Sequence, residues 1–307
     1  MSAAVVPGVA VASDGTDLIG WVPHPEVWLL VAGVVALYAY AASVIGPKAV
    51  PVGTPPISRS QWRWFVIGTL LLWVASDWPV HDIGEQRLYL VHMAQHTVLT
   101  LVMPPILLMA TPEWLARLVI GDGRAHRWVD RLARPLPALL IFNSLALLIH
   151  WQVVVNGASS NGIFHYGVHT AIVASAFLLW LPVCGPLPEL RISRPAQMLY
   201  LFATSLVPTV PGAWLVFAEG AVYSAYDIPA RLWGISVTTD QQVAGAIMKL
   251  GAGTYLWVII AVLFFRWAAS QAEQVPGPPR LPITVGEDDD VLTWEQVERE
   301  LAEHPAP

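Results

Sequence analysis

Charged residues are scarce in this sequence. They make up 12% of the 307 residues, whereas 55% of the residues are hydrophobic and the mean hydropathy is +0.56. Soluble globular domains carry about 25% charged residues, so the composition excludes an ordinary soluble domain and indicates a chain built for a lipid bilayer. The few basic residues form no extended basic face, which excludes a nucleic-acid-binding protein.

Cysteine is also nearly absent, because Cys184 is the only one. The chain can therefore form no internal disulfide and no metal site with several thiolates. The sequence lacks a glycine-rich phosphate loop, a nucleophile elbow and a metalloprotease helix, so we do not expect an enzyme. Residues 1–20 contain no Lys or Arg. They lack the charged start of a cleavable signal peptide and are expected to form an exposed arm.

Long apolar segments are what the sequence does have. A membrane span needs about 20 apolar residues, and the segments that qualify are bounded by Pro, Gly or charge. They lie at about 26–45, 61–78, 88–110, 136–154, 163–183, 196–218 and 243–267. The sequence predicts an all-α polytopic membrane protein with a transmembrane domain of about seven helices over 26–270. We expect residues 1–25 to be an extracytoplasmic arm and 271–307 a flexible acidic tail with a short helix capped at Thr293.

The basic residues predict which loops face the cytoplasm. One set of loops carries ten of them: Lys48, Arg59, Arg63, Arg117, Arg124, Arg127, Arg131, Arg134, Arg191 and Arg194. The opposite loops carry only Arg87 and Arg231. Cytoplasmic loops are enriched in Lys and Arg, so the amino terminus is predicted outside and the tail inside, in a multi-pass protein of the plasma membrane.

Histidines gather at the predicted outer side. Seven of the nine lie there: His24, His81, His92, His96, His150, His165 and His169. Two pairs, His92 with His96 and His165 with His169, share the pattern His-x-x-x-His-Thr, which places each pair on one helix face, one turn apart. Both spans run from outside to inside. We expect the pairs to meet in one polar pocket, with His150 and Asp77 at the outer ends of the preceding spans.

Such a pocket predicts a metal site. Ionisable side chains inside a bilayer are expensive and usually mark a functional site. Imidazole suits copper, zinc and haem iron, and the thioether of Met93 would favour Cu(I). His150, Asp77 and His81 are candidates for additional ligands or for groups that orient the ligands. The plainer alternative is that the histidines only form hydrogen bonds between helices.

Lys249 is the only ammonium group placed at depth in a predicted span. We expect it to neutralise Asp77 or Asp240 as a structural ion pair, and the functional alternative is a proton or ligand gate. Lys249 and Asp240 therefore join the outer residues of the candidate site. The pairs Pro104-Pro105 and Pro208 with Pro211 are expected to kink the third and sixth spans.

One segment resembles a known family. Residues 87–112 read RLYLVHMAQHTVLTLVMPPILLMATP. This order resembles the hallmark of the CtaG-type cytochrome c oxidase assembly factors, in which a His-Met-x-x-His helix leads into Pro-Pro and Leu-Leu. Further agreement lies at 161–182, 223–226, 240–249 and 264–267, so the resemblance covers about 62–267. The stretch Ser76–His81 departs from the Ser-Pro-Leu-His-like pattern of the family.

The resemblance implies a seven-helix membrane protein that helps to assemble haem-copper oxidases and to deliver copper to the catalytic subunit. It makes His92, His96, His165 and His169 candidate copper ligands, with Met93 as a soft ligand. The implied partners are the membrane, the catalytic subunit of cytochrome c oxidase and an extracytoplasmic copper donor.

Three other functions stay open at this point. Paired histidines on parallel helices could hold a haem b for electron transfer, but the predicted inner half offers no second histidine pair. A metal permease would need polar groups through the midplane, where only Lys249 lies. A scaffold that binds oxidase subunits and no metal is the strongest alternative. The sequence does not identify the oxidase, the oxidation state of the copper, the oligomeric state or the role of the tail.

Overall fold

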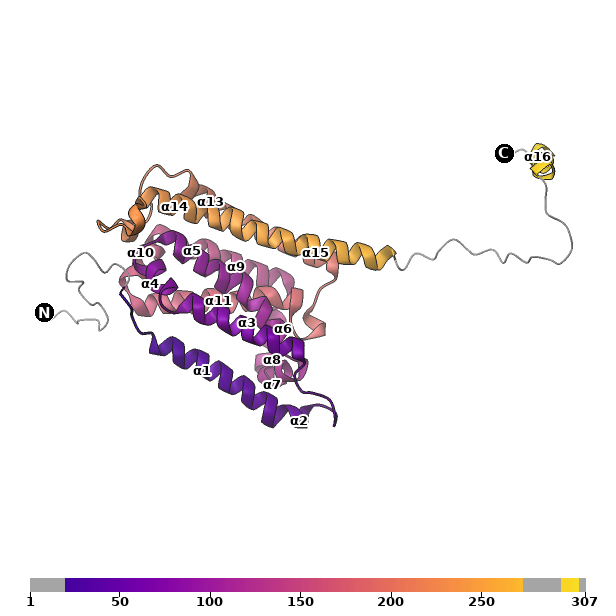
Figure 1. The fold of residues 1–307 in the computed structure, drawn as a ribbon, viewed down its shortest axis with the longest axis horizontal. Helices are drawn as coiled ribbons and strands as arrows, with labels where there is room; N and C mark the ends of the chain where they lie inside the picture. Colours follow the sequence, from indigo (N-terminus) through magenta and orange to yellow (C-terminus); the bar gives the residue numbers. More distant parts are fainter. Residues whose placement is uncertain (1–19, 273–293, 304–307) are drawn as a thin grey trace. The chain divides into compact units, whose positions relative to one another are not determined.

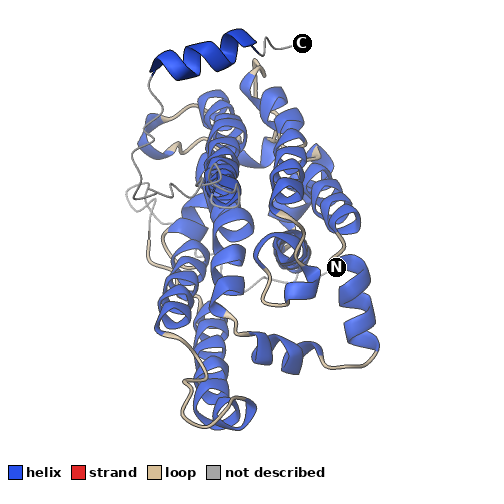
Figure 2. Ribbon diagram, turned by 90° about the vertical axis from the view of Figure 1, so that its right-hand side faces the viewer, coloured by secondary structure: helices blue, strands red, loops and turns tan. Residues whose placement is uncertain are grey.

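The computed structural model of the chain describes residues 20–272 and 294–303. Helices dominate these two ranges and no strand occurs in them, which confirms the all-α class (Figure 2). The chain divides between Trp267 and Ala268 into two units. In the second unit α16 (Trp294–Glu303) is the helix predicted in the tail. The predicted cap Thr293, the acidic run at 287–290 and arm residues 1–19 lie outside the described residues.

Helices form the bundle of the first unit (Figure 1). They are α1 (Pro25–Tyr40), α3 (Arg59–Ser76), α5 (Tyr89–Thr97), α6 (Met103–Ala110), α9 (Pro135–Ile149), α11 (Gly162–Cys184), α12 (Arg194–Leu206), α13 (Thr209–Val216), α14 (Val237–Ala246) and α15 (Ala252–Ala272), the last of which continues past Trp267. Connecting helices lie at the two ends: α2 (Gly46–Ala49), α4 (Val80–Gln86), α7 (Glu113–Ile120), α8 (Arg124–Leu132) and α10 (Gln152–Ser160).

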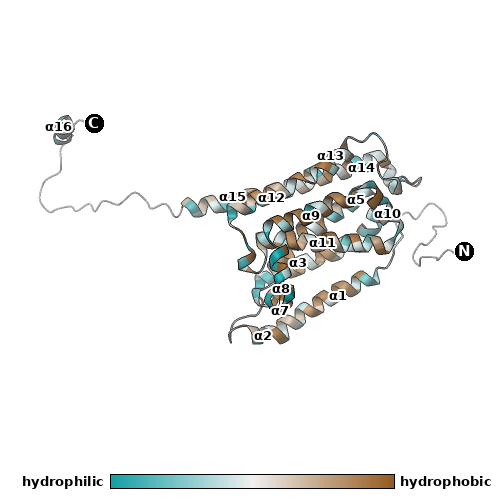
Figure 3. Ribbon diagram, turned by 180° about the vertical axis from the view of Figure 1, so that it is seen from behind, coloured by the Kyte–Doolittle hydropathy of each residue, from teal (hydrophilic) through white to brown (hydrophobic). Residues whose placement is uncertain are grey.

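Five continuous helices of the described residues are long and apolar enough to cross a membrane. They are Pro25–Ala49, Tyr89–Ala110, Gly162–Cys184, Arg194–Val216 and Val237–Ala272. A sixth is possible if α8 and α9, which are bent by 77° relative to each other, form one broken span. Figure 3 shows hydrophobic colouring along α1 and hydrophilic colouring on α8.

The predicted span at 61–78 corresponds to α3, which is not among these apolar helices. Arg59, Gln61 and Arg63 lie in its first two turns and lower its mean hydropathy. The helix nevertheless packs against α1 and α6 in the bundle. Seven spans and their orientation therefore stay predictions.

Local chemistry explains where the helices that carry the histidines begin. The side chain of Asn161 accepts a hydrogen bond from the backbone N–H of Phe164 and caps α11. The carboxylate of Asp240, on the distant helix α14, accepts from the N–H groups of Tyr89 and Leu90 at 2.9 and 2.8 Å. These are unsatisfied donors of the first turn of α5, so α14 caps α5.

The third predicted span, at 88–110, is interrupted near its two adjacent prolines, as the sequence predicted. Between α5 and α6 the chain forms a π-helical turn at Val98–Val102, directly before Pro104 and Pro105. Proline has no backbone N–H to donate, and a π-turn is a common adjustment that is frequent at functional sites. The indole of Trp180 donates to the carbonyl oxygen of Thr100 at 3.2 Å. This bond joins α11 to the widened turn and fixes the two histidine helices relative to each other.

Candidate metal centre

The two histidine pairs meet at one end of the bundle, the end that also carries α4 and α10 in Figure 1. His92 and His96 project from α5, and His165 and His169 from α11. Ring centroids lie 4.4 Å apart for His96 and His169 and 5.4 Å apart for His92 and His169. The structure therefore brings together the four residues that the sequence placed in one pocket.

Three of these imidazoles have the geometry of a metal site. One nitrogen each of His92, His96 and His169 lies within 4.8 Å of the others. The Nε2 atoms of His96 and His169 are 3.3 Å apart. With metal–nitrogen bonds of about 2.05 Å, this separation corresponds to a nitrogen–metal–nitrogen angle of about 107°, close to the tetrahedral value.

His165 lies beside this group. Its ring stacks on that of His169 with the centroids 4.3 Å apart and is 6.0 Å from that of His92. Nε2 of His165 and Nδ1 of His92 are buried and have no hydrogen-bond partner. A buried polar atom left unpaired costs about 1–3 kcal/mol, so two such atoms in one cluster suit a ligand better than a purely structural role.

Glu85 stands behind the cluster and was not identified from the sequence. Its carboxylate lies 2.8 Å from Nε2 of His81 and 3.7 Å from Nδ1 of His165. Burial acts to raise the pKa of Glu85, but the hydrogen bond from His81 and the nearby histidines lower it overall. The spacing of four residues between His81 and Glu85 on α4 is the signal that could have found it.

The contacts of His81 fix its role. The amide nitrogen of Gln95 can only donate, and it lies 3.3 Å from Nδ1 of His81. Nδ1 therefore accepts, and Nε2 carries the proton that His81 donates to Glu85. His81 thus holds the carboxylate rather than facing the three-histidine group. Gly84 permits this arrangement, because a Cβ there would lie 3.1 Å from backbone atoms of His92.

His24 marks the outer rim of the same polar region. Its Nε2 lies 2.9 Å from the carboxylate of Asp82 and its Nδ1 lies 3.1 Å from that of Glu26. Burial acts to lower the pKa of His24, but its hydrogen bonds to Asp82 and Glu26 raise it overall. The ring of His24 is 5.1 Å from that of His81, so a line of imidazoles and carboxylates leads inward.

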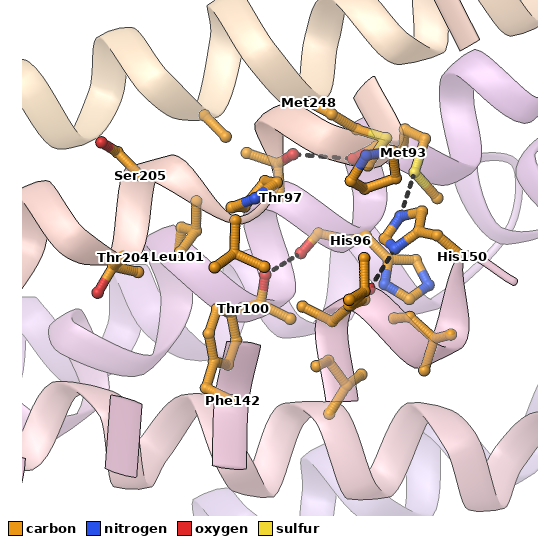
Figure 4. Close-up of a pocket in the computed structure, with 18 of the residues that line it drawn as sticks. Met93, His96, Thr97, Thr100, Leu101, Phe142, His150, Thr204, Ser205 and Met248 are labelled. Atoms are coloured by element: carbon orange, nitrogen blue, oxygen red, sulfur yellow. Dashed lines mark hydrogen bonds between the residues drawn. The ribbon is translucent and has the colours of Figure 1, made fainter. Parts of the chain in front are cut away.

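Met93 and His150 face each other and also line the small cavity of the two histidine pairs. Nε2 of His150 lies 3.4 Å from Sδ of Met93. Nδ1 of His150 contacts the carbonyl oxygen of Ala146. Figure 4 shows this pair at one end of a cavity, with Met248 beside it.

The remaining predicted site residues lie elsewhere. Asp77 accepts hydrogen bonds from the indoles of Trp28 at 2.9 Å and Trp73 at 2.7 Å, so it links α1 to α3. The expected pairing of Lys249 with Asp77 or Asp240 is wrong in this structure. Lys249 donates to the hydroxyl of Thr209 at 2.7 Å.

Asp240 has a different cation as its partner. Its fully buried side chain forms an ion pair with Arg231 at 3.5 Å. Arg231 and Lys249 are each nine residues from Asp240 along the chain, but Arg231 lies in the loop that leads into α14 and its guanidinium reaches the carboxylate. Asp240 therefore stabilises the start of α5 and touches no histidine of the cluster.

Two hollows are each lined by two or more of the four paired histidines. A cavity of about 30 Å³ is lined by the four histidines of the pairs, by His150 and by Tyr226. A larger cleft of about 560 Å³ between α1, α3 and α11 is lined by Glu26, His81, His165 and His169 among others. His165 and His169 of the two pairs are thus reached from the cleft.

Comparison with models of known protein families identifies the family of the chain. A family model described as "Cytochrome c oxidase caa3 assembly factor (Caa3_CtaG)" matches residues 36–270, which is most of the chain. No solved structure matches the chain.

Curated relatives come from mycobacteria. Uncharacterized proteins of Mycobacterium bovis and Mycobacterium tuberculosis are each 23% identical over 303 residues, covering 88% of this chain and 43% of their own length. An uncharacterized protein of Mycobacterium leprae is 22% identical over 297 residues, covering 85% of this chain and 44% of its own length. The chain therefore spans less than half the length of these relatives.

Proposed function

This chain belongs to the cytochrome c oxidase caa3 assembly factor family, and from that premise we propose that it carries copper as cargo to the catalytic subunit of the oxidase. The family description implies association with the oxidase and with the membrane. It names a role in assembly rather than a reaction.

The arrangement of His92, His96 and His169 carries the proposal. Their nitrogens lie within 4.8 Å of one another, and one pair has a separation that fits bonding to a single ion. His165 supplies a fourth imidazole within reach of the same group. Glu85 lies 3.7 Å from Nδ1 of that imidazole, and an approach of a few tenths of an ångström would form the hydrogen bond by which a carboxylate fixes a ligand histidine.

The donor set favours copper over the common hard cations. Imidazole nitrogens suit copper and zinc, whereas Mg²⁺ and Ca²⁺ need oxygen ligands. The three-histidine group contains no carboxylate. A site of a few neutral ligands that is open to a cleft suits an ion that must be released again, since an incoming ligand from a partner can replace one histidine at a time.

The predicted orientation gives the direction of transfer. If the histidine end faces outside, copper reaches it from an extracytoplasmic donor without crossing the membrane. The same end would then face the outer part of the oxidase subunit.

Oxidase assembly in cells tests this function. A strain that lacks the gene is complemented with the wild-type chain, with His96→Ala/His169→Ala, or with Arg117→Gln as a control at the opposite end of the bundle. Copper and haem are then measured in the purified oxidase. We expect the histidine variant to yield an oxidase with its haem but deficient in copper, while the control behaves as wild type.

The scaffold alternative predicts a different result. If the chain only holds oxidase subunits together, the histidine variant restores fully copper-loaded oxidase, and this outcome would overturn copper delivery. Immunoblots of the membranes show whether each variant is present in equal amount.

A further inference from the structure

His150 presents an unprotonated nitrogen to Met93. A carbonyl oxygen can only accept a hydrogen bond, so Nδ1 of His150, which contacts the carbonyl of Ala146, is the nitrogen that carries the proton. Nε2 of the neutral ring is left with a lone pair. It faces the thioether sulfur of Met93 at 3.4 Å, and a thioether has no proton to donate. Two electron-pair donors thus face each other in a buried site.

The separation of these two atoms fits a bridging metal ion. Metal–imidazole bonds are about 2.05 Å and metal–sulfur bonds about 2.3 Å. A nitrogen–sulfur distance of 3.4 Å then corresponds to an angle at the metal of about 103°. That angle lies between those of tetrahedral and square arrangements and needs little movement of either side chain.

A second thioether is available in the same place. Met248 is 6% exposed, belongs to the same buried apolar cluster as Met93, and lines a cavity of about 70 Å³ with Met93, His96 and His150. Figure 4 shows Met248 and Met93 together beside His150, at the opposite end of the cavity from Thr204 and Ser205.

The side chains that line this cavity favour a monovalent ion over a divalent one. The cavity is lined otherwise by apolar and hydroxyl side chains, including Leu101 and Phe142, and by no carboxylate. A divalent ion without a negative ligand would be poorly stabilised there, whereas a soft monovalent ion needs less compensation. Thioethers prefer such soft ions.

We infer that Met93, Met248 and His150 form a second metal subsite, selective for a soft monovalent ion such as Cu(I), beside the three-histidine group. His96 lines the cavities of both sites, so an ion can pass between them by ligand exchange without a change of oxidation state. The assignment of copper rests on the proposed function, whereas the ligand set rests on this geometry.

Silver binding tests the subsite, because Ag(I) is a redox-inert probe for Cu(I). The full chain is purified in detergent, and Ag(I) and Zn(II) affinities are measured for wild type, Met93→Leu, Met248→Leu and Met103→Leu. Met103 is a matched control, since it is 1% exposed but packs with Ala75 and Leu99 in a different cluster. We expect the first two variants to bind Ag(I) at least tenfold more weakly, with Zn(II) binding unchanged, and the control to match wild type.

X-ray absorption of Ag(I) bound to the wild-type chain gives a second readout that needs no variant. We expect a silver–sulfur shell together with nitrogen. A spectrum with nitrogen alone, or equal Ag(I) affinity in Met93→Leu and Met103→Leu, would overturn the inference. Failure of the proposed function is separate, because oxidase copper loading could be independent of the histidines while Ag(I) still binds to sulfur.

Discussion

The two ends of the bundle are both polar, but they handle their polar groups in opposite ways. At the end that carries α7 and α8, Arg117 forms ion pairs with Glu113 and Glu189 at 2.8 and 2.9 Å, and these side chains are about half exposed. At the histidine end the polar groups are turned inward, and the buried nitrogens of His92 and His165 lack partners.

This comparison distinguishes ordinary surface ion pairs from a binding site. Exposed ion pairs contribute about 0–1 kcal/mol each, because water and salt screen them. Unpaired buried groups cost more than that, so a fold keeps them where a ligand compensates. Single unpaired buried atoms also occur at Thr69 on α3 and at Asn143 on α9. The functional end is therefore marked by unpaired nitrogens within a cluster of imidazoles, rather than by polarity or by one unpaired atom. Four variants can break or sharpen this contrast.

The largest effect is expected from removing two ligands of the histidine end. His96→Ala/His169→Ala should weaken copper binding at least 1,000-fold, or about 4 kcal/mol, because two of three aligned donors are lost. Competition with a chelator of known affinity measures this change. The metal-free thermal stability should fall only modestly, because the two truncations leave a cavity but remove no hydrogen bond to the rest of the fold. A large loss of stability would instead assign these histidines a structural role.

Asp240→Asn should destabilise the fold by about 3 kcal/mol. The substitution leaves Arg231 without its buried partner and removes the charge that caps α5 at Tyr89 and Leu90. Thermal unfolding in detergent measures the change, and addition of copper should recover part of it because the ion ties α5 to α11. Wild-type stability of this variant would contradict the assigned cap.

Glu85→Gln should weaken copper binding by about 10–100-fold, because the amide no longer orients His165 as a carboxylate does. Metal titration of Glu85→Gln is compared with that of Glu113→Gln, which replaces an exposed glutamate at the opposite end of the bundle. The comparison shows whether the loss of affinity depends on where the carboxylate lies. Glu85→Asp should recover part of the affinity. Equal affinity of the two Gln variants would show that the carboxylate behind the cluster plays no part.

Arg117→Gln should have the smallest effect, with an unfolding temperature close to that of the wild type and unchanged metal binding, because both of its ion pairs are exposed to solvent. Thermal unfolding at low and high salt tests this expectation. Salt screens the ion pairs, so the difference in unfolding temperature between the variant and the wild type should be smaller at high salt. A large effect would mean that the opposite end also carries a built site.

Sequence patterns predicted a good part of this account. Hydropathy located α1, α5 with α6, and α11 to within a few residues, and the repeated His-x-x-x-His-Thr spacing predicted that four histidines meet. The π-turn before Pro104 follows the expected interruption of that span. These features depend on periodicity along one chain segment, which a sequence displays directly.

The missed features depend on contacts between segments. Nothing in the sequence joins Asp240 to Arg231 rather than to Lys249, because side-chain reach across a loop decides that pair. The spacing of His81 and Glu85 indicates a pair on one helix, but only the approach of α4 to α5 at Gly84 places Glu85 beside the histidines. Met248 joins Met93 only through packing between distant segments. The bend between α8 and α9 is equally invisible to hydropathy, since both halves remain helical.

X-ray absorption of copper bound to the purified wild-type chain tests the central claim most directly. The account predicts about one tightly held copper per chain with nitrogen neighbours at about 2.0 Å and imidazole scattering beyond them. Additional sulfur scattering on reduction would place Cu(I) at the thioethers. A chain that retains no copper, or copper with oxygen neighbours alone, would contradict the claim that the buried histidines form the metal centre.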